Sequence, residues 1–315
     1  MLLRALAYLP RTHLYHIRRS FGIKFDKMPL PSTGVVETSI PRPITMPSLL
    51  EALPITAKTL SVIEQSKRLA AYKAVDRHVR PEHKIIGIGS GSTVPYVVER
   101  IVAQGHDLNK HRVFIPTGFQ SKELIVMSKL NLGDVDQYPT IDVTIDGADE
   151  VDTDLNCIKG GGACHLREKV LAEAAKTFIL VADHRKNVEY LGQNFTAGVP
   201  IEVVPFAYAK VLQNLQHVIG SPNATLRMAK AKAGPVVSDN GNFIIDAPFP
   251  RDVMKDPYTI MARIKMLTGV VEVGLFCHMA EAAYFGNEDG SVTLKKRMVP
   301  DVATPVIEEQ IPSSE

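Results

Sequence analysis

Residues 141–183 have the sequence IDVTIDGADEVDTDLNCIKGGGACHLREKVLAEAAKTFILVAD, which decides the class of fold. Short apolar segments at 141–148 and 178–183 predict two buried strands, and residues 164–176 between them predict an amphipathic helix. A strand, a crossover helix and a second strand form a βαβ unit, whose strands are parallel and whose connection is right-handed. The stretch therefore predicts a parallel sheet with helices on its faces.

The same alternation is found toward the N-terminus. Strands are expected at residues 84–89 and 112–117, and helices at residues 59–79, 93–104 and 120–130. Short apolar strands separated by amphipathic helices build a parallel sheet that is covered on both faces. The predicted fold of this part is a doubly wound α/β domain.

The pattern changes after Pro200. Strands are expected at residues 199–206, 224–229 and 270–276, a hairpin at 235–246, and helices at 207–219 and 256–267. Asn240-Gly241 favours the tight turn of that hairpin. A smaller antiparallel α+β domain is therefore predicted at 200–274, inserted into an α/β domain at 58–199 and 275–297. Residues 282–296 are expected to add an edge strand to the α/β domain.

The composition is that of an ordinary soluble globular protein. The chain has 315 residues, of which 45% are hydrophobic and 22% are charged, and its formal net charge is +2. This balance does not suggest a nucleic-acid partner, and no stretch is long and apolar enough to span a membrane. Three cysteines without a metal-binding spacing indicate a reduced compartment and no metal site.

The first 57 residues differ from the rest of the chain. From Met1 to Thr45 there are seven Lys or Arg residues and two acidic residues. This composition is typical of an organelle-targeting presequence, and an untranslated or disordered leader before a later start, for instance at Met46, explains it equally well. Neither alternative makes residues 1–57 part of the fold, and residues 298–315 are expected to be a tail.

A glycine-rich loop follows the strand expected at 84–89. The loop, Gly87-Ile88-Gly89-Ser90-Gly91-Ser92-Thr93, leads into a helix, so small residues, hydroxyls and a helix N-terminus are available to an anion. Ser92 stands where the dinucleotide fingerprint needs glycine, and the loop lacks the lysine of the ATP-type motif. A small phosphorylated ligand suits this loop, and a tight turn with a serine cap explains it equally well when it is taken alone.

A second polar segment follows the strand expected at 141–148. Asp146 and Asp149 enclose Gly147 and Ala148, whose small size leaves room for a ligand against the backbone. Two close carboxylates repel each other unless a cation offsets them, and Lys159 is the candidate cation. Three glycines follow it at 160–162, where a flexible linker between a central strand and its crossover helix is unexpected.

Glu168 lies in the first turns of the helix expected at 164–176. The helix dipole alone favours an acid at this place. Together with Lys159, however, Glu168 fits proton abstraction next to a carbonyl, because a positioned carboxylate is the base and a cation meets the developing oxygen charge. With Asp146 and Asp149 binding hydroxyls and a phosphate anchored elsewhere, the reaction is aldose–ketose isomerisation.

Six motifs occur in one order: IGIGSGSTV (86–94), IPTGFQS (115–121), TIDGADEVD (144–152), IKGGGACHLREK (158–169), VADHRK (181–186) and SDNGNFIID (238–246). With these motifs the chain resembles the A-type ribose-5-phosphate isomerases from about Lys67 to Val292. The resemblance implies a Rossmann-like domain, a smaller α+β, ferredoxin-like lid domain and a homo-oligomer, either dimer or tetramer. It also implies interconversion of D-ribose 5-phosphate and D-ribulose 5-phosphate through an enediol(ate), in the non-oxidative pentose phosphate pathway, without metal, cofactor or nucleotide.

The resemblance also implies roles for single residues. Glu168 matches the general base, Asp146 and Lys159 match positions that handle the O1/O2 protons and charge, and Asp149 matches one implicated in sugar binding and ring opening. The remaining matches are substrate contacts, with phosphate as the expected target of the two lysines: Ser90, Gly91, Ser92, Thr93, Gly147, Ala148, Gly160, Gly161, Gly162, Lys186 and Lys67. His165 and His184 are expected to be bystanders.

Other proteins share this α/β fold. Sugar-phosphate-sensing domains of transcription regulators carry a helix-turn-helix, which the Pro-punctuated leader does not offer, and coenzyme A transferases need a nucleophilic carboxylate and a larger acceptor site. A catalytically dead phosphosugar-binding module is a third alternative, against which intact Asp146, Lys159 and Glu168 argue. The expected partners are a small sugar phosphate and copies of the chain, without nucleic acid or membrane. The expected compartment is the cytoplasm, with a mitochondrial or other organellar location second.

Overall fold

The structure is a computed structural model that describes residues 60–297 and 306–312. All of them belong to one compact unit of the chain, residues 47–315. The predicted leader at 1–57 lies outside the described residues, as do residues 298–305 and 313–315 of the predicted tail. The described strands form sheets of seven, four and three strands.

The largest sheet contains β1 (Ile85–Ile88), β2 (Val113–Pro116), β3 (Val143–Asp146), β6 (Phe178–Asp183), β12 (Ala282–Gly286), β13 (Val292–Arg297) and β14 (Val306–Ile311). Their order across the sheet is β14-β13-β12-β6-β3-β1-β2. Neighbouring strands from β12 to β2 are parallel, whereas β13 and β14 are antiparallel to their neighbours. The prediction of an α/β fold with a mostly parallel central sheet is therefore confirmed.

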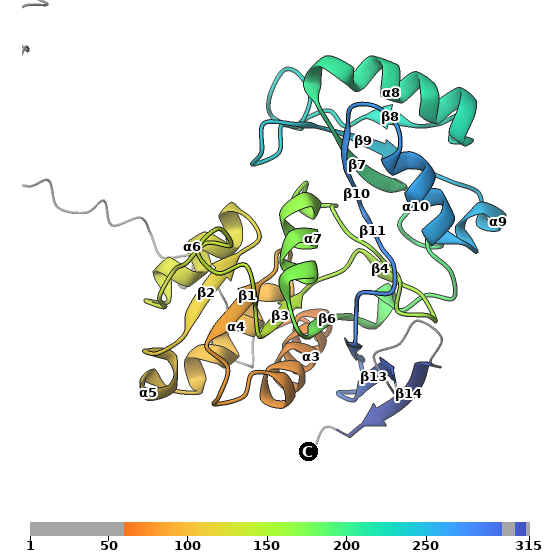
Figure 1. Ribbon diagram of the computed structural model, residues 1–315. Helices are drawn as coiled ribbons and strands as arrows, with labels where there is room; N and C mark the ends of the chain where they lie inside the picture. The colour runs from red at the N-terminus through yellow and green to blue at the C-terminus, as the bar shows by residue number, and fades with distance from the viewer. Residues whose placement is uncertain (1–59, 298–305, 313–315) are drawn as a thin grey trace, which may run out of the picture. The chain divides into compact units, whose positions relative to one another are not determined.

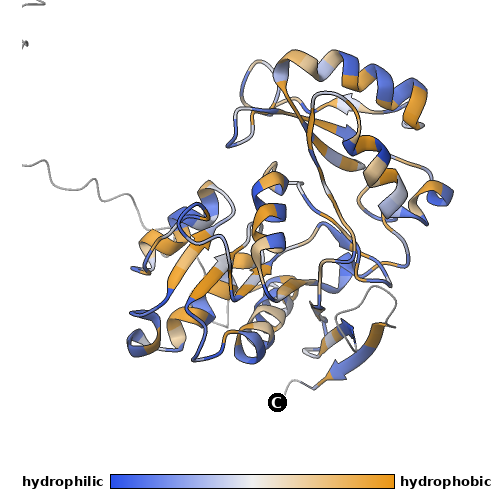
Figure 2. Cartoon of the chain, viewed as in Figure 1, coloured by the Kyte–Doolittle hydropathy of each residue, from blue (hydrophilic) through white to orange (hydrophobic). Residues whose placement is uncertain are grey.

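The central strands are apolar because both faces of the sheet are covered. All six residues of β6 and all four residues of β3 are buried. Figure 2 shows β1 and β2 largely in the orange of hydrophobic residues. Both β3 and β6 nevertheless end in an aspartate, Asp146 and Asp183 respectively. The carboxyl edge of a hydrophobic sheet therefore carries buried acidic groups.

The α-helices of this part of the structure are α3 (Val62–His78), α4 (Val94–Ala103), α5 (His106–Asn109), α6 (Phe119–Met127) and α7 (His165–Ala174). α3 buries the small side chains of Ala70, Ala71 and Ala74 in the same core as the strands. A Cβ atom at Gly286 of β12 would lie 1.8 Å from the carbonyl oxygen of Ser66. Glycine at this position therefore allows the backbone of α3 to approach the sheet closely.

The second sheet is antiparallel and contains β7 (Val199–Val203), β8 (Thr225–Leu226), β9 (Phe243–Ala247) and β10 (Val270–Val273), in the order β10-β7-β9-β8. The helices that follow its strands are α8 (Tyr208–Asn214), α9 (Arg251–Met254) and α10 (Pro257–Lys265), and Figure 1 shows α8 and α10 beside the strands. This sheet has its own hydrophobic core, which includes Ile201, Ile245 and Ile264. The additional antiparallel layer that the sequence predicts is therefore present.

A small third sheet links the other two along the chain. It contains β4 (Glu150–Val151), β5 (Cys157–Ile158) and β11 (Leu275–Phe276), paired in the order β11-β5-β4. The single strand predicted at 270–276 is therefore divided between two sheets, β10 in one and β11 in the other. The division falls at Gly274, whose N–H donates to the Pro200 carbonyl (2.7 Å) and whose carbonyl accepts from Lys159 N (2.9 Å).

Several other elements differ in detail from the prediction. At the predicted hairpin, Gly241 N donates to the Ser238 carbonyl (2.9 Å) with Gly241 at φ +79°, but residue 237 pairs with 243 through an isolated bridge only. The helix predicted at 207–219 changes from α8 to a π-helix over Leu215–Ile219. The segment 282–296 forms two strands instead of one, and β14 lies within the predicted tail. The domain boundaries themselves stay predictions.

Candidate active site

A pocket of about 140 Å³ opens where the carboxyl ends of β1, β3 and β6 meet the N-terminal end of α7. Thirteen of the fifteen residues predicted for the site line it, from the loop at 90–93 to Lys186. The two exceptions are Asp146, which is fully buried, and Lys67. The position agrees with the rule that parallel sheets bind ligands at the carboxyl ends of their strands.

Asp146 is fully buried at the end of β3 and is held by the glycine-rich loop. Its Oδ1 accepts hydrogen bonds from Ser90 N (2.9 Å) and Gly147 N (2.7 Å). A Cβ atom at Gly89 would lie 2.0 Å from the same oxygen and 2.5 Å from the Asp146 Cα. Glycine is therefore needed at the end of β1 so that the neighbouring strand can place this carboxylate.

Lys159 lies close to the carboxylates of both Asp146 and Glu168, and the three residues form a charged cluster. Its Nζ lies 2.9 Å from Asp146 Oδ2 and 3.3 Å from Glu168 Oε1, and it donates to the Gly147 carbonyl at 2.5 Å. Burial disfavours its charge, but the charges of Asp146 and Glu168 outweigh burial and raise the pKa of Lys159. Lys159 therefore carries a fixed positive charge at neutral pH.

Glu168 has two different carboxylate oxygens. Oε1 accepts a short hydrogen bond from Ser90 Oγ and faces Lys159. Oε2 is buried and has no hydrogen-bond partner among residues 60–297 and 306–312. Burial raises the pKa of Glu168 to about 7, with Lys159 acting against the rise and Asp146 contributing to it. An unpaired oxygen on a carboxylate with this pKa has the properties of a general base near neutral pH.

The glycine-rich segment at 160–162 is tied to its surroundings. Gly161 N donates to Asp149 Oδ2 (2.7 Å), and a Cβ atom at Gly161 would lie 2.5 Å from Asp149 Oδ1. Gly160 has φ +102°, and a Cβ atom there would lie 2.5 Å from His165 Nδ1. Two of the three glycines are thus needed for close contacts, and the loop presents its backbone to the pocket beside Asp149.

The loop at 90–93 also contributes backbone and hydroxyl groups to the pocket. Gly91 has φ +99°, and its N–H donates to Gln120 Oε1 (2.8 Å). Thr93 is the N-cap of α4, and Ser92 is exposed. The arrangement of small residues before a helix N-terminus is the one expected for anion binding.

Lys186 and Lys67, the two lysines expected to contact the phosphate, differ in their positions relative to the pocket. Lys186 is partly buried and lines the pocket. Lys67 is 7% exposed, does not line the pocket, and pairs with Glu64 at 2.7 Å. The charge of Lys67 acts on Asp183, which does line the pocket. Lys67 therefore reaches the site through electrostatics, and its direct contact with substrate stays a prediction.

Sequence reasoning missed Ala182 and Asp183, which also line the pocket. Burial favours the neutral acid at Asp183, but its hydrogen bonds with Arg185 outweigh this effect and lower its pKa. Asp183 ends β6 as Asp146 ends β3, and these strands are neighbours in the sheet. An aspartate at the carboxyl end of a predicted parallel strand was therefore the available signal.

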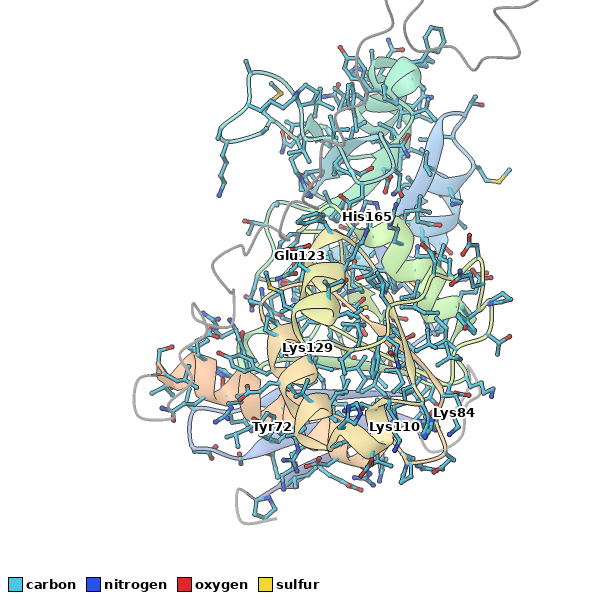
Figure 3. The ribbon with its side chains drawn as sticks, turned by 90° about the vertical axis from the view of Figure 1, so that its left-hand side faces the viewer. Tyr72, Lys84, Lys110, Glu123, Lys129 and His165 are labelled. Atoms are coloured by element: carbon cyan, nitrogen blue, oxygen red, sulfur yellow. The ribbon has the colours of Figure 1, made fainter. Side chains whose placement is uncertain are left out.

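His165 does not line the pocket. Figure 3 places it on α7, at the end directed toward the antiparallel sheet, and its Nε2 lies 3.4 Å from the Glu272 carbonyl of β10. Burial lowers the pKa of His165 to about 3, so its ring is neutral at physiological pH. These properties describe a packing residue.

Within the described ranges, no group of three or more His, Cys, Asp or Glu side chains is arranged to hold a metal ion. No helix in those ranges is long and apolar enough to cross a membrane. The prediction of a reaction without metal or cofactor stays a prediction.

The fold and the Asp146–Lys159–Glu168 cluster define an α/β enzyme with a buried acid–base site. The family model for ribose 5-phosphate isomerase A (phosphoriboisomerase A) matches residues 113–290. A ribose-5-phosphate isomerase of Cryptococcus neoformans var. neoformans is 65% identical over 274 residues, covering 85% of this chain and 86% of that protein. One of Mycosarcoma maydis is 69% identical over 236 residues, covering 75% and 82%.

A solved structure is similar as well. The structure of a D-ribose-5-phosphate isomerase in complex with phospho-erythronic acid aligns with a TM-score of 0.67 at 38% identity. The alignment covers 75% of this chain and 99% of that one. The chain belongs to the ribose 5-phosphate isomerase A family.

Proposed function

We propose that the protein interconverts D-ribose 5-phosphate and D-ribulose 5-phosphate, as an aldose–ketose isomerase of the non-oxidative pentose phosphate pathway. The observation that carries the proposal is the unpaired Oε2 of Glu168, buried at a pocket beside the cation of Lys159. The choice of substrate follows from the family, because the relatives from Cryptococcus neoformans and Mycosarcoma maydis are both named ribose-5-phosphate isomerases.

Glu168 is the proposed base. In the open-chain aldose its carboxylate removes the proton from C2, and the electrons of that C–H bond form the C1–C2 double bond of an enediolate. The negative charge develops on O1, where the fixed cation of Lys159 stabilises it. O1 then gains a proton, O2 loses one, and Glu168 returns its proton to C1, so that the ketose forms without a net change in protons.

Asp146 and Asp149 have separate proposed roles. Asp146 is fully buried and holds Lys159 in its charged form, so it acts on the O1/O2 protons through that lysine. Asp149 lines the pocket and is proposed to bind sugar hydroxyls and to assist ring opening. The small residues Gly147 and Ala148 between them leave the backbone accessible to the sugar.

The phosphate is proposed to bind the loop at 90–93 with Lys186, and the backbone of 160–162 to contact the sugar near Lys159. The pocket holds these backbone groups together with a partly buried lysine, which supports the assignment. The solved relative that is described with phospho-erythronic acid, a phosphorylated sugar acid, also supports a site for such a ligand.

One assay tests the proposal. We expect the wild type to isomerise ribose 5-phosphate in the presence of a chelator, and Glu168→Gln to lose about 10²- to 10⁴-fold in kcat, the usual contribution of a general base. Loss of wild-type turnover with the chelator would contradict a metal-free reaction. Near-normal turnover of the variant would exclude Glu168 as the base, and binding without turnover by the wild type would favour a phosphosugar-binding module.

We further propose a homo-oligomer, either dimer or tetramer, in the cytoplasm. Phe206 and Met266 of the antiparallel part are 101% and 85% exposed, and their burial between copies of the chain would remove apolar surface from water. Light scattering after size-exclusion chromatography is expected to give a multiple of the chain mass.

The proposed compartment has a test of its own. Fluorescence microscopy of the full chain with a C-terminal tag distinguishes the cytoplasm from mitochondria or another organelle.

A further inference from the structure

Arg227 connects the antiparallel sheet with the glycine segment at 160–162. The residue follows β8 directly, and its Nη1 donates to the carbonyl oxygens of Gly160 (2.9 Å) and Gly161 (3.1 Å). Its side chain is 15% exposed and does not line the pocket. No motif of the sequence indicated Arg227, because its contacts are 66 and 67 residues away along the chain.

The guanidinium group is itself held in one orientation. Nε of Arg227 donates to Asp246 Oδ2 (2.8 Å), and Nη2 donates a short hydrogen bond to Asp246 Oδ1. Arg227 N also donates to the Ile244 carbonyl (2.8 Å). A planar guanidinium paired in this bidentate way has a defined direction for its remaining N–H groups, and these point to the glycine segment.

The contact reaches Asp149 through a single peptide unit. The carbonyl of Gly160 and the N–H of Gly161 belong to the same planar peptide group, in which they point in opposite directions. Arg227 holds the oxygen on one side, and on the other side Gly161 N donates to Asp149 Oδ2 (2.7 Å). Within the loop, the same Gly160 oxygen also accepts from Ala163 N (2.9 Å). Glycines have the largest backbone freedom of all residues, so the contact that Arg227 adds from outside the loop further restricts the orientation of this peptide group.

We propose that Arg227 is a positioning residue that orients Asp149 through the Gly160–Gly161 peptide group. The inference rests on the proposed function, because it gives Asp149 a role on the sugar. Arg227 and its partner Asp246 both lie in the antiparallel part of the structure. That part then supports the reaction by fixing one peptide group of the pocket.

A double-mutant cycle tests this coupling. We expect Arg227→Met to lower kcat/KM for ribose 5-phosphate by about 10- to 100-fold, as a displacement of roughly 1 Å does. Because Arg227 acts through Asp149, the double variant with Asp149→Asn should be no worse than Asp149→Asn alone. Wild-type kinetics of Arg227→Met, or losses that multiply in the double variant, would overturn the proposal.

Arg100→Met is the matched control. Arg100 forms the same kind of bidentate pair with Asp76 (2.7 and 2.8 Å) and lies outside the pocket, so we expect wild-type kinetics. If circular dichroism shows that Arg227→Met is unfolded, the cycle is made with Arg227→Lys, whose single ammonium cannot serve Asp246 and both carbonyls together. A folded Arg227→Lys with wild-type kinetics would overturn the proposal.

Amide hydrogen exchange provides a readout that does not depend on turnover. The Gly161 amide should exchange faster in Arg227→Met than in the wild type, whereas Arg100→Met should leave its exchange unchanged. Unchanged exchange of Gly161 in Arg227→Met would overturn the positioning role. A wild type without isomerase activity would instead refute the proposed function, and the exchange data would still decide whether Arg227 holds the peptide group.

Discussion

At the scale of single residues, the proposed chemistry depends on three buried charged groups, Asp146, Lys159 and Glu168, that influence one another's pKa. Asp146 and Glu168 keep Lys159 charged, and burial raises the pKa of Glu168 to about 7. Below this pKa Glu168 is protonated and cannot accept a proton from carbon. We therefore expect kcat/KM to rise with pH and to level off above about 7, measured as a pH profile with ribose 5-phosphate.

Ser90 allows the origin of this pH dependence to be tested. Its hydroxyl donates to Glu168 Oε1 and stabilises the ionised carboxylate, so it lowers the pKa of Glu168. In Ser90→Ala the rising limb of the profile should therefore move to higher pH. Ser128→Ala, which changes a serine outside the pocket, should leave the limb in place. A limb that stays, or that moves to lower pH in Ser90→Ala, would contradict this account of Glu168.

The same three residues show what could be predicted from sequence. Local patterns of the sequence indicate each of them. Asp146 follows a strand, Lys159 precedes three glycines, and Glu168 lies in the first turns of a helix. The chemical difference between the two oxygens of Glu168 was not predictable, because Ser90 lies 78 positions away in the chain. Arg227 was missed for the same reason, since its partners come together only in the folded molecule.

At the scale of elements, the ends of β1 and β3 position the cluster. Gly89 leaves no room for a side chain, because its Cβ would lie 2.5 Å from the backbone Cα of Asp146. We expect Gly89→Ala to lower the free energy of unfolding in urea by about 1–3 kcal/mol, the usual range for overpacking a well-packed site. The substitution should also reduce kcat, because Asp146 is displaced.

Gly162→Ala is the control for this loss of stability. A Cβ atom at Gly162 meets no atom within 4 Å, so its unfolding free energy should stay within about 1 kcal/mol of the wild type or rise slightly. Equal stabilities of the two variants would show that the close approach at Gly89 does not constrain the strands.

At the scale of the whole molecule, the alternation of strands and helices made the parallel sheet predictable. Its strands are short, apolar and locally encoded, and β6 was predicted with the bounds that the structure has. The division of residues 270–276 between two sheets was not predictable, because Gly274 bonds to Pro200 and Lys159, which are distant in sequence. β14 was missed although its partner β13 is near in sequence, because the sequence VIEEQI lacks the regular alternation of apolar and polar residues that indicates a strand.

Gly274 therefore gives a prediction about how the sheets are joined. Its Cβ position lies 2.3 Å from the Lys159 carbonyl oxygen and 2.8 Å from that of Pro200. Both obstacles are backbone atoms, so Gly274→Ala should shift β10 or β11 and lower the free energy of unfolding by about 1–3 kcal/mol. Thermal unfolding followed by circular dichroism measures this, and an unchanged melting temperature would contradict the close packing at this joint.

The central claim is that Glu168 carries a proton between C2 and C1, and solvent exchange tests it most directly. In D₂O, nuclear magnetic resonance follows deuterium at C2 of ribose 5-phosphate and at C1 of ribulose 5-phosphate. We expect the wild type to incorporate deuterium at both carbons, and Glu168→Gln to bind phospho-erythronic acid but to incorporate none. Deuterium incorporation by Glu168→Gln at the wild-type rate would show that another group moves the proton.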